Sequence, residues 1–339
     1  MSPMPLDPTR PEMGERLHDA LRAGAIARPA PGLGTSDLRV SLLGTGESYA
    51  AWRAGDGATS LVFRLARRPV EDMPCPMADE LRAAAFVPDG IGSRALAVDD
   101  TGENALGCPH VISTFVPGEV RAPGDWDRAL LGAHARRLAE LHRRTFDLAG
   151  RIGEPGSRFD IVEEFDGGWS WWKEVHPEVT DDPGVIELAA AIRLRLLAAA
   201  PAFEGIVYSV IHADLVSTNV LVDEAGTPRY IDWEWARIGD VANDLALIGG
   251  AVTGGPWYVP MDEATIDGFL TDYLAARQEQ GGPVEDPERL RVRRDAWELT
   301  ERFLSSLHFE MKAETAGGRG MYADATRRVR EGLRRVVER

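Results

Sequence analysis

The sequence has 339 residues, of which 44% are hydrophobic and 27% charged, a composition typical of globular proteins. Its formal net charge of −16 should repel nucleic acid duplexes and anionic membranes and attract cationic small molecules. The two cysteines, Cys75 and Cys108, form no disulfide framework or metal cluster and fit a reducing cytosol. Because neither a signal-peptide core nor 18 consecutive uncharged apolar residues occur, we expect a cytoplasmic protein that binds neither nucleic acid nor membrane.

Short strands are predicted to dominate the first third of the chain. After a proline-rich start, the pattern over residues 12–23 predicts a short amphipathic helix in an N-terminal extension, 1–35. Partly alternating apolar segments, separated by Gly-containing turns, then predict a small antiparallel sheet with one inserted helix, which we expect to form a first lobe, 36–116. The expected strands are 38–44, 48–55, 59–66, 94–100 and 110–118, and the expected helix is 76–87.

Helices are predicted from residue 124 onward. An apolar stripe with a period of 3.6 residues over 125–146 indicates the first of them. Pro117 and Gly118 mark the expected crossover into a second lobe, 117–339. The sequence thus predicts an α+β, two-lobed protein with a small antiparallel sheet and one main helix in one lobe and a larger, mainly helical second lobe. Further helices are expected at 184–200, 262–279, 288–310 and 322–338.

The stretch VIHADLVSTNVLVDEAGTPRYIDWEW places acids and an amide in two strands joined by a turn. If the six residues after Val222 form the loop, Val222 opposes Arg229 and Asn219 opposes Asp232, with Cβ atoms about 4.5–5.5 Å apart. An amide oxygen and a carboxylate at that separation suit Mg²⁺, which takes a few protein oxygens and keeps water or phosphate oxygens besides. We therefore expect Asn219 and Asp232 to be metal ligands.

Asp214 lies five residues before Asn219, and His212 lies two places ahead of Asp214. This H-x-D-x4-N spacing is the catalytic-loop pattern of kinases, in which the aspartate takes the proton of the acceptor hydroxyl and the asparagine holds metal. Each residue alone has a simpler explanation as a turn or a strand-end cap. The combination H-x-D-x4-N-x12-D around a strand, a turn and a second strand favours a phosphoryl-transfer site.

The stretch IHADLVSTNVLVDEAGTPRYIDWEWARIGDVANDLA resembles the HGDLHPGNILVD, VIDWEYA and GDPAYDLA core of the aminoglycoside phosphotransferase and choline kinase-like superfamily. These small-molecule kinases have a protein-kinase-like fold, and the resemblance implies that fold over about 36–250. One departure is Ala213, which stands where the family usually has Gly. The roles that the resemblance implies are Asp214 as catalytic base, Asn219 and Asp232 as magnesium ligands, His212 as a support of the loop, and Asp244 as a residue that holds backbone.

To bind its nucleotide, a kinase of this fold requires a cationic side chain on the third strand that reaches the phosphates. A carboxylate on a helix holds that cation in place. Because no lysine precedes Lys173, Arg64 is the candidate for this cation, and Glu80 is its expected partner. The stretch LVFRLARRP also resembles VLRIPRRPD of macrolide phosphotransferases. The alternative is that Arg64 faces water from an edge strand. GTGES is expected over the phosphates, and HVISTFVPGE to pair with the purine, although G-x-G alone is a weak signal. The expected nucleotide-binding residues are Gly44, Thr45, Gly46, Ser48, Arg64, Glu80, Thr114, Phe115 and Val116.

The acceptor side is expected to carry acids and aromatic residues. In EEFDGGWSWWKE, the acids suit the amines of aminoglycosides or peptide antibiotics, whereas tryptophan faces suit a quaternary ammonium or an apolar macrocycle. The alternative is that Trp169 and Trp172, three residues apart, anchor a helix in the core. The acceptor-binding candidates are Glu234, Trp169, Trp172, Glu298 and Glu301.

These patterns predict an Mg²⁺-dependent O-phosphotransferase that moves the γ-phosphoryl group of ATP or GTP to a hydroxyl of an aminoglycoside or macrolide antibiotic and so inactivates it. One alternative is a metabolic kinase for choline, thiamine or a sugar, because IDWEWA is close to the IDWEYA of such enzymes. An alternative of another class is a nucleotide-binding pseudokinase. The intact His212, Asp214, Asn219 and Asp232 argue against it.

Overall fold

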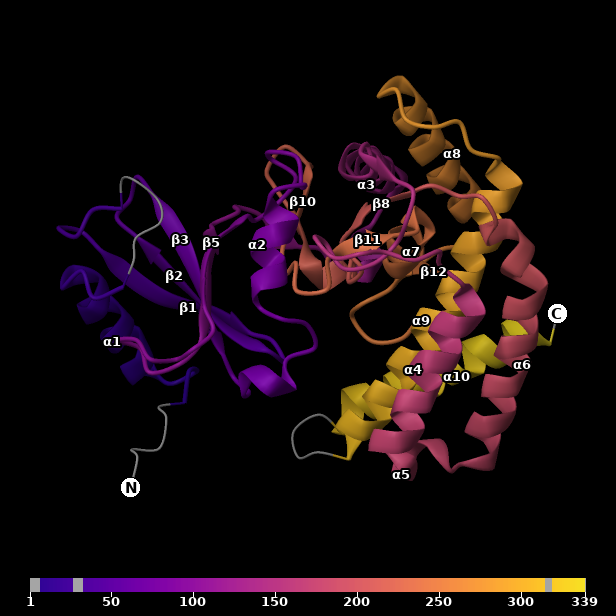
Figure 1. Cartoon of the computed structure of the whole chain (residues 1–339), viewed down its shortest axis with the longest axis horizontal. Coiled ribbons are helices and arrows are strands. Elements are labelled where there is room, and N and C mark those ends of the chain that lie inside the picture. The colour runs from indigo at the N-terminus through magenta and orange to yellow at the C-terminus, as the bar shows by residue number, and fades with distance from the viewer. Residues whose placement is uncertain (1–6, 27–32, 315–318, 339) are drawn as a thin grey trace. The chain divides into compact units, whose positions relative to one another are not determined.

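The computed structural model describes residues 7–26, 33–314 and 319–338 and divides into two compact units (Figure 1). The β-rich unit comprises Met1–Pro117 and Ile231–Ala236, and the helical unit comprises Gly118–Tyr230 and Arg237–Arg339. One strand-rich and one helix-rich unit confirm the predicted α+β class. Among the described residues, no helix combines the length and the apolar character that crossing a membrane requires.

A five-stranded antiparallel sheet with the order β1-β2-β3-β5-β4 forms the β-rich unit. Leu61, Phe63 and Leu65 of β3 are buried in the core on one face of this sheet. Because side chains alternate along a strand, Arg64 is on the opposite face. The strands are β1 Arg39–Thr45, β2 Tyr49–Gly55, β3 Ser60–Ala66, β4 Ala95–Asp99 and β5 His110–Thr114, and the helices are α1 Pro11–Arg22, α2 Ala78–Ala84 and a 3₁₀ turn, Val70–Asp72.

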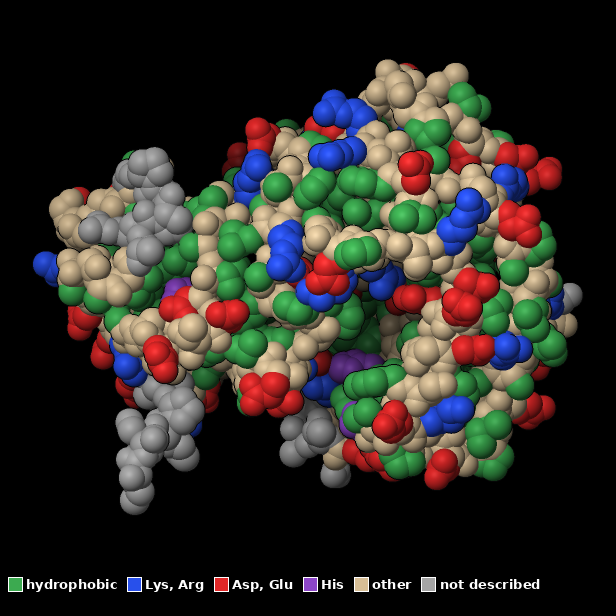
Figure 2. All heavy atoms as spheres, viewed as in Figure 1, with side chains coloured by type: hydrophobic (Ala, Val, Ile, Leu, Met, Phe, Trp, Pro, Cys, Tyr) green, Lys and Arg blue, Asp and Glu red, His purple; other side chains and the backbone are tan. Residues whose placement is uncertain are grey.

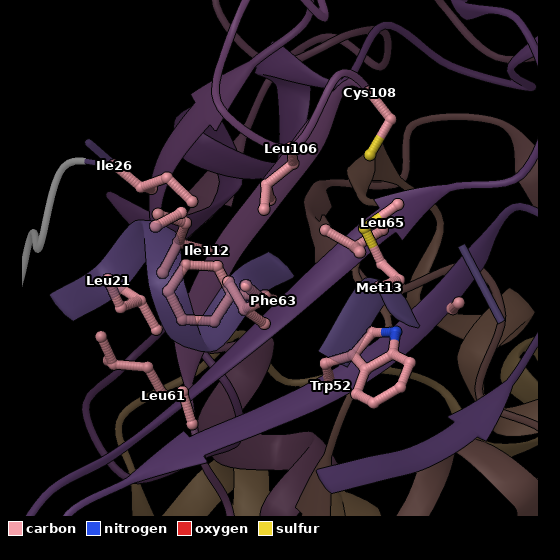
Figure 3. Packing of buried hydrophobic residues seen from close by; sticks show 14 of the residues in the cluster. Met13, Leu21, Ile26, Trp52, Leu61, Phe63, Leu65, Leu106, Cys108 and Ile112 are labelled. Atoms are coloured by element: carbon pink, nitrogen blue, oxygen red, sulfur yellow. The ribbon is translucent and has the colours of Figure 1, made fainter. Parts of the chain in front are cut away.

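Helix α1 packs on the core face of this sheet (Figure 3). Its buried Met13, Leu17 and Leu21 recur every four residues, which puts them on one face of the helix. Trp52 of β2 lies against Gly14, where an added Cβ would come 2.5 Å from the indole ring. Each fully buried apolar side chain contributes about 1.5–3 kcal/mol. The helix of the N-terminal segment is therefore part of the hydrophobic core of the β-rich unit.

Aspartates begin most helices of the helical unit, because each accepts a hydrogen bond from a backbone N–H of the first turn. These caps are Asp127, Asp160, Asp182, Asp240, Asp262 and Asp286. The helices are α3 Arg128–Leu141, α4 Ile161–Val175, α5 Pro177–Thr180, α6 Pro183–Ala199, α7 Val241–Leu247, α8 Glu263–Glu279, α9 Pro287–Ala313 and α10 Arg319–Val337. Three 3₁₀ turns are Pro123–Asp125, Ala200–Phe203 and Ser217–Asn219.

Small sheets connect these helices. One has the order β10-β9-β6, one the order β11-β8-β7, and β12 pairs with β13 in parallel. The strands are β6 Glu119–Val120, β7 Thr145–Phe146, β8 Tyr208–Ile211, β9 Val220–Val222, β10 Pro228–Tyr230, β11 Arg237–Gly239, β12 Gly249–Gly250 and β13 Val259–Pro260.

The predicted register of the β9–β10 hairpin is wrong by one residue. Val222 pairs with Pro228, not with Arg229, so the expected opposition of Asn219 and Asp232 is not part of this ladder. The loop is one residue shorter than predicted because Asp223 closes it: its N–H donates to the Thr227 carbonyl (3.1 Å) and its side chain accepts the Thr227 N–H (2.9 Å). The ladder ends at Tyr230, paired with Val220.

Helix α4 forms across Gly167 and Gly168, the glycines that made EEFDGGWSWWKE ambiguous in sequence. Asp160 caps its first turn by accepting the N–H of Val162 (2.7 Å). A Cβ at Gly168 would lie 2.9 Å from Leu304 of α9, so glycine here allows α4 and α9 to approach closely. Helix packing thus outweighs the low helix propensity of the two glycines.

Acidic and basic side chains are interspersed over the helical unit on the face shown in Figure 2. Arg193 forms a bidentate ion pair with Asp166, and Arg291 contacts Glu263, Asp267 and Asp295. Such exposed pairs contribute little to stability individually.

Candidate functional site

The segment from His212 to Asn219 follows β8 and is held by one buried carboxylate. The backbone N–H groups of His212 and Ala213 donate to Oδ2 and Oδ1 of Asp244, both at 2.8 Å. Asp244 lies on α7 and is fully buried. Ala213 has φ 62°, a left-handed conformation that favours glycine. The family's preference for Gly at this position therefore has a conformational reason, and Asp244 fixes the turn in spite of the Ala213 methyl group.

Asn219 fixes the other end of this segment. Its Nδ2 donates to both the carbonyl oxygen and the Oδ2 of Asp214, at 2.8 Å each. The amide oxygen of Asn219 is on the opposite side of the same group, so it is directed away from Asp214. Asp214 itself is half-buried. The arrangement orients the Asp214 carboxylate and presents an amide oxygen, a ligand type that Mg²⁺ accepts.

A buried hydrogen-bond network supports Asp244 from behind. His142, which caps the C-terminus of α3, contacts Asp244 Oδ2 through Nε2 (3.1 Å) and the Tyr273 hydroxyl through Nδ1 (3.0 Å). Arg277 donates to the same hydroxyl (2.8 Å). Burial alone would raise the pKa of Asp244, but His142, His212 and their hydrogen bonds lower it. Asp244 therefore stays ionised and can accept several hydrogen bonds at once.

Arg64 is buried in the β-rich unit between two carboxylates and an aromatic ring. Its Nη1 pairs with Glu80 of α2 and its Nη2 with Asp232. The guanidinium lies 4.1 Å from the ring centroid of Tyr49. Burial would lower the pKa of Arg64, but Asp232 and Glu80 raise it. The expected Arg64–Glu80 pair is thus present, and the alternative of a water-facing arginine is wrong because the side chain is only 8% exposed.

Asp232 and Glu234 lie in the segment Ile231–Ala236, which belongs to the β-rich unit. Asp232 has φ 69°, a left-handed conformation that aspartate tolerates better than most residues. Ser48 donates to Glu234 through its hydroxyl (3.3 Å). Burial, with the nearby Asp232 carboxylate, raises the pKa of Glu234 to about 8. Glu234, expected on the acceptor side, is therefore grouped with the expected nucleotide-binding Ser48.

The G-x-G segment forms the turn between β1 and β2. Gly44 and Thr45 are the last residues of β1, and the Gly46 N–H donates to the Tyr49 carbonyl (2.8 Å). Arg67 contacts this turn through a bond from its guanidinium to the Gly46 carbonyl. The turn is exposed up to Ser48, which is buried. Its exposed backbone is suited to contact a phosphate.

The expected purine-binding segment follows β5. The Thr114 N–H donates to the Arg94 carbonyl (3.0 Å), and the Phe115 N–H to the Ser60 carbonyl (3.4 Å). The Phe115 ring is covered by the guanidinium of Arg53 at 4.1 Å. The N–H groups of Thr114 and Phe115 are therefore already bonded within the β-rich unit, whereas the Val116 N–H has no backbone partner in the part of the chain that the structure describes.

The expected acceptor-binding residues of the helical unit differ in how deeply they are buried and in the contacts that they make. Trp172 is 8% exposed and packs on His176 with ring centroids 5.1 Å apart. Trp169 packs edge-on against Phe303 of α9 at 5.5 Å. Glu298 is buried, pairs with Arg294 and accepts the Val252 N–H (2.7 Å). Trp172 and Glu298 are buried and bonded within the helical unit, which for Trp172 is the alternative of a core anchor given above.

Glu301 differs from Glu298 because it is half-buried, whereas Glu298 is buried. It accepts a hydrogen bond from Asn243 (2.7 Å), and burial raises its pKa. Burial raises the pKa of Tyr258, and the negative charges of Glu301 and Asp214 both add to that shift. Of the acidic acceptor candidates in the helical unit, Glu301 is the one with an electrostatic link to the region of Asp214.

The family model that matches this chain is the phosphotransferase enzyme family, over residues 39–293. The chain belongs to this family. Viomycin phosphotransferase of Streptomyces vinaceus is 28% identical over 183 residues, which are 51% of this chain and 61% of the relative. The match thus spans about six tenths of that relative's length.

Solved structures of other proteins share the fold of this family member. A putative aminoglycoside phosphotransferase of Ralstonia eutropha JMP134 superimposes with a TM-score of 0.61 at 17% identity, covering 96% of this chain and 97% of the other. Choline kinase LicA of Streptococcus pneumoniae gives 0.62 at 16% identity, covering 96% and 99%. A thermostable mutant of aminoglycoside phosphotransferase APH(4)-Ia, in a ternary complex with ADP and hygromycin B, gives 0.56 at 17% identity, covering 89% and 94%. At these identities the likeness establishes the kinase-like fold.

The sequence analysis did not predict three residues that support the candidate groups, Tyr49 in the β-rich unit and His142 and Ser217 in the helical unit of this phosphotransferase family member. Tyr49 stacks on Arg64, His142 supports Asp244, and Ser217 bonds the segment 256–257. Tyr49 directly follows the expected Ser48, and His142 lies within the helix predicted over 125–146, so each carried a weak signal. Ser217 carried none, because its partner is 39 positions away.

Proposed function

We propose that this protein is a small-molecule kinase that transfers the γ-phosphoryl group of ATP or GTP to a hydroxyl of its acceptor. Asp214 takes the proton of that hydroxyl while the acceptor oxygen bonds to phosphorus and the nucleoside diphosphate leaves. The supporting observation is the pair of hydrogen bonds by which Asn219 orients Asp214. A positioned carboxylate with ordinary access to solvent suits general-base work.

On the nucleotide side we propose 36–116 as the nucleotide-binding lobe and 117–339 as the catalytic and acceptor-binding lobe. Arg64, held by Glu80 and Tyr49, would contact the phosphates. Mg²⁺ would neutralise charge on the phosphates when bound. The proposed ligands offer the oxygen donors that this ion prefers, an amide oxygen from Asn219 and a carboxylate from Asp232. Among the described residues, no group of three or more His, Cys, Asp or Glu side chains could hold a metal ion.

We infer that the acceptor is an antibiotic of the aminoglycoside, macrolide or peptide type and that phosphorylation inactivates it. The viomycin phosphotransferase relative supports this inference, as does the half-buried Glu301, an acid suited to a cationic amine. The fold likeness to choline kinases keeps choline, thiamine and sugars as the alternative acceptors to be tested.

A mass-shift screen tests this proposal. The purified protein is incubated with Mg²⁺ and ATP or GTP and with viomycin, hygromycin B, a macrolide, choline, thiamine or a hexose. We expect one antibiotic to gain 80 mass units, the mass of HPO₃, and Asp214→Ala to abolish the gain while nucleotide binding persists. A gain on choline, thiamine or a sugar would support the metabolic alternative. Nucleotide binding without transfer to any compound, or to water, would contradict the kinase proposal and favour a pseudokinase.

The metal proposal has a separate test. ATP with Mg²⁺ should raise the melting temperature of the wild-type protein more than ATP with EDTA does, because binding to the folded state stabilises it. Asp232→Ala should remove the Mg²⁺-dependent part of that shift. Asp223→Ala is the matched control, because Asp223 is a carboxylate that closes the hairpin turn. An unchanged Mg²⁺ effect in Asp232→Ala would remove Asp232 from the ligand set.

A further inference from the structure

Ser217 bonds the catalytic segment to a distant loop by two hydrogen bonds. Its N–H donates to the carbonyl of Trp257 (2.9 Å), and its hydroxyl donates to the carbonyl of Pro256 (2.7 Å). Ser217 is fully buried and lies between Asp214 and Asn219 in the chain. Where the family pattern HGDLHPGN has proline, this chain thus has a residue with two donors, which proline could not supply.

The loop that accepts these bonds is itself anchored to the last two helices. The ring of Trp257 stacks on Phe309 of α9 (centroids 4.5 Å apart) and on Tyr322 of α10 (5.5 Å). A Cβ at Gly254 would lie 2.8 Å from Val329 of α10, so this glycine allows close contact with that helix. The neighbouring Gly255 has φ +64°, which favours glycine. Helices α9 and α10 therefore fix the position of the two carbonyl groups.

We propose that Ser217 is a positioning residue that couples helices α9 and α10, through Trp257, to the orientation of Asp214 and Asn219. The proposal rests on the proposed kinase function, for which Asp214 is the base. Two hydrogen bonds to residues 256–257, which α9 and α10 anchor, hold the turn Ser217–Asn219 in place. Movement of Trp257, which is half-buried, would be transmitted to the base through two hydrogen bonds.

Proline at position 217 gives a sharp test because the local backbone already suits it. Ser217 is the first residue of a 3₁₀ turn, where proline is tolerated, and Val216 before it has φ −73° and ψ 160°, the extended conformation required before proline. The proline ring would remove both donors, and its Cδ would displace the Trp257 carbonyl. Ser217→Pro therefore removes both hydrogen bonds while the backbone conformation of the turn can stay the same. Ser217→Ala removes only the bond of the hydroxyl group.

The experiment measures kcat and KM for ATP in the full-length protein, with an acceptor from the screen or with water as acceptor. We expect Ser217→Ala to lower kcat by about fivefold to tenfold, the equivalent of one hydrogen bond, and Ser217→Pro to lower it further, while KM for ATP changes less than about twofold. Trp257→Ala should lower kcat in the wild type and add little in Ser217→Pro, because both changes remove one connection. Ser306→Ala removes another buried serine hydroxyl, which donates to Phe303 of α9 and lies 3.5 Å from Arg330 of α10. It should leave kcat unchanged, because it keeps both bonds of Ser217 to residues 256–257.

Amide hydrogen exchange of a peptide spanning 210–222 gives a readout that needs no turnover. Exchange should accelerate in Ser217→Ala and Trp257→Ala but not in Ser306→Ala. Loss of turnover in Asp214→Ala combined with unchanged kcat and exchange in the Ser217 variants would overturn the coupling and leave the kinase proposal standing. Full turnover in Asp214→Ala would instead contradict the kinase mechanism, and the exchange result would then decide the structural coupling alone.

Discussion

The guanidinium of Arg64 lies 4.1 Å from the centre of the Tyr49 ring and at the same time pairs with Glu80 and Asp232. A planar guanidinium can stack on an aromatic face and direct two nitrogens at two carboxylates, whereas a lysine ammonium is a compact charge on a flexible stem. In a chain with lysine only at positions 173 and 312, the site is thus built for arginine. Tyr49 and Glu80 restrain Arg64 before any phosphate is present.

Arg64→Lys should weaken ADP binding by about tenfold, because the lysine loses the stacking contact and one of the two ion pairs, together worth about 1–2 kcal/mol. Titration calorimetry with ADP measures the affinity. Tyr49→Leu should show a smaller loss and Tyr49→Phe a smaller one still, since phenylalanine keeps the ring. Arg39→Lys is the control, because Arg39 is an exposed arginine at the start of β1. Equal affinities for wild type and Arg64→Lys would contradict the role assigned to stacking.

Much of the fold could be predicted from the sequence, and local spacing was enough to propose the central residues of the candidate site. Apolar periodicity located the sheet and most helices, and the spacing of Asp214, Asn219 and Asp232 selected the same turn and hairpin that the structure contains. The register of that hairpin could not be fixed, since loops of five and six residues fit the apolar pattern equally well, and Asp223 decides between them. Contacts between residues far apart in the chain could not be predicted from local patterns. The hydrogen bond that Glu298 of α9 accepts from the Val252 N–H is an example.

Asp244→Asn should destabilise the protein by about 2–4 kcal/mol, because Asp244 accepts bonds from two backbone N–H groups and from His142 and an amide has a single acceptor atom. The free energy of unfolding from urea denaturation is the measurement. Asp262→Asn is the matched control: Asp262 caps α8 at an exposed position, and asparagine caps helices about as well. Equal stability of the two variants would show that the bonds of Asp244 to His212 and Ala213 do not stabilise the segment that follows β8.

Ala213→Gly should stabilise the protein by up to about 1 kcal/mol. The left-handed conformation of Ala213 (φ 62°) costs an L-residue roughly 1–2 kcal/mol, and the greater freedom of glycine in the unfolded chain offsets part of that gain. Ala139→Gly, in the buried part of α3, should instead destabilise, since glycine there has only costs. Urea denaturation of both variants checks the sign. Destabilisation by Ala213→Gly would mean that the methyl group packs favourably in the turn.

Acid should destabilise the protein through His134. This residue is fully buried against Tyr230, Phe269 and Trp126, and burial lowers its pKa to about 3 from the ordinary 6.5. Between these values the unfolded chain binds a proton at this residue and the folded protein does not, so stability falls as pH decreases from 6.5 toward 3, by about 1.4 kcal/mol per pH unit.

The His134 contribution is measured as a slope, so that it is separated from the effect of the substitution on packing. The free energy of unfolding is determined from pH 7 to pH 4 for the wild type and for His134→Phe, which keeps a ring beside Phe269 but loses the bond to the Tyr230 hydroxyl (3.0 Å in the wild type). The variant should be less stable at pH 7. The slope of its unfolding free energy against pH should nevertheless be smaller by about 1.4 kcal/mol per pH unit, which corresponds to one proton. Parallel pH profiles for the two proteins would show that His134 takes up its proton equally in the folded and unfolded states.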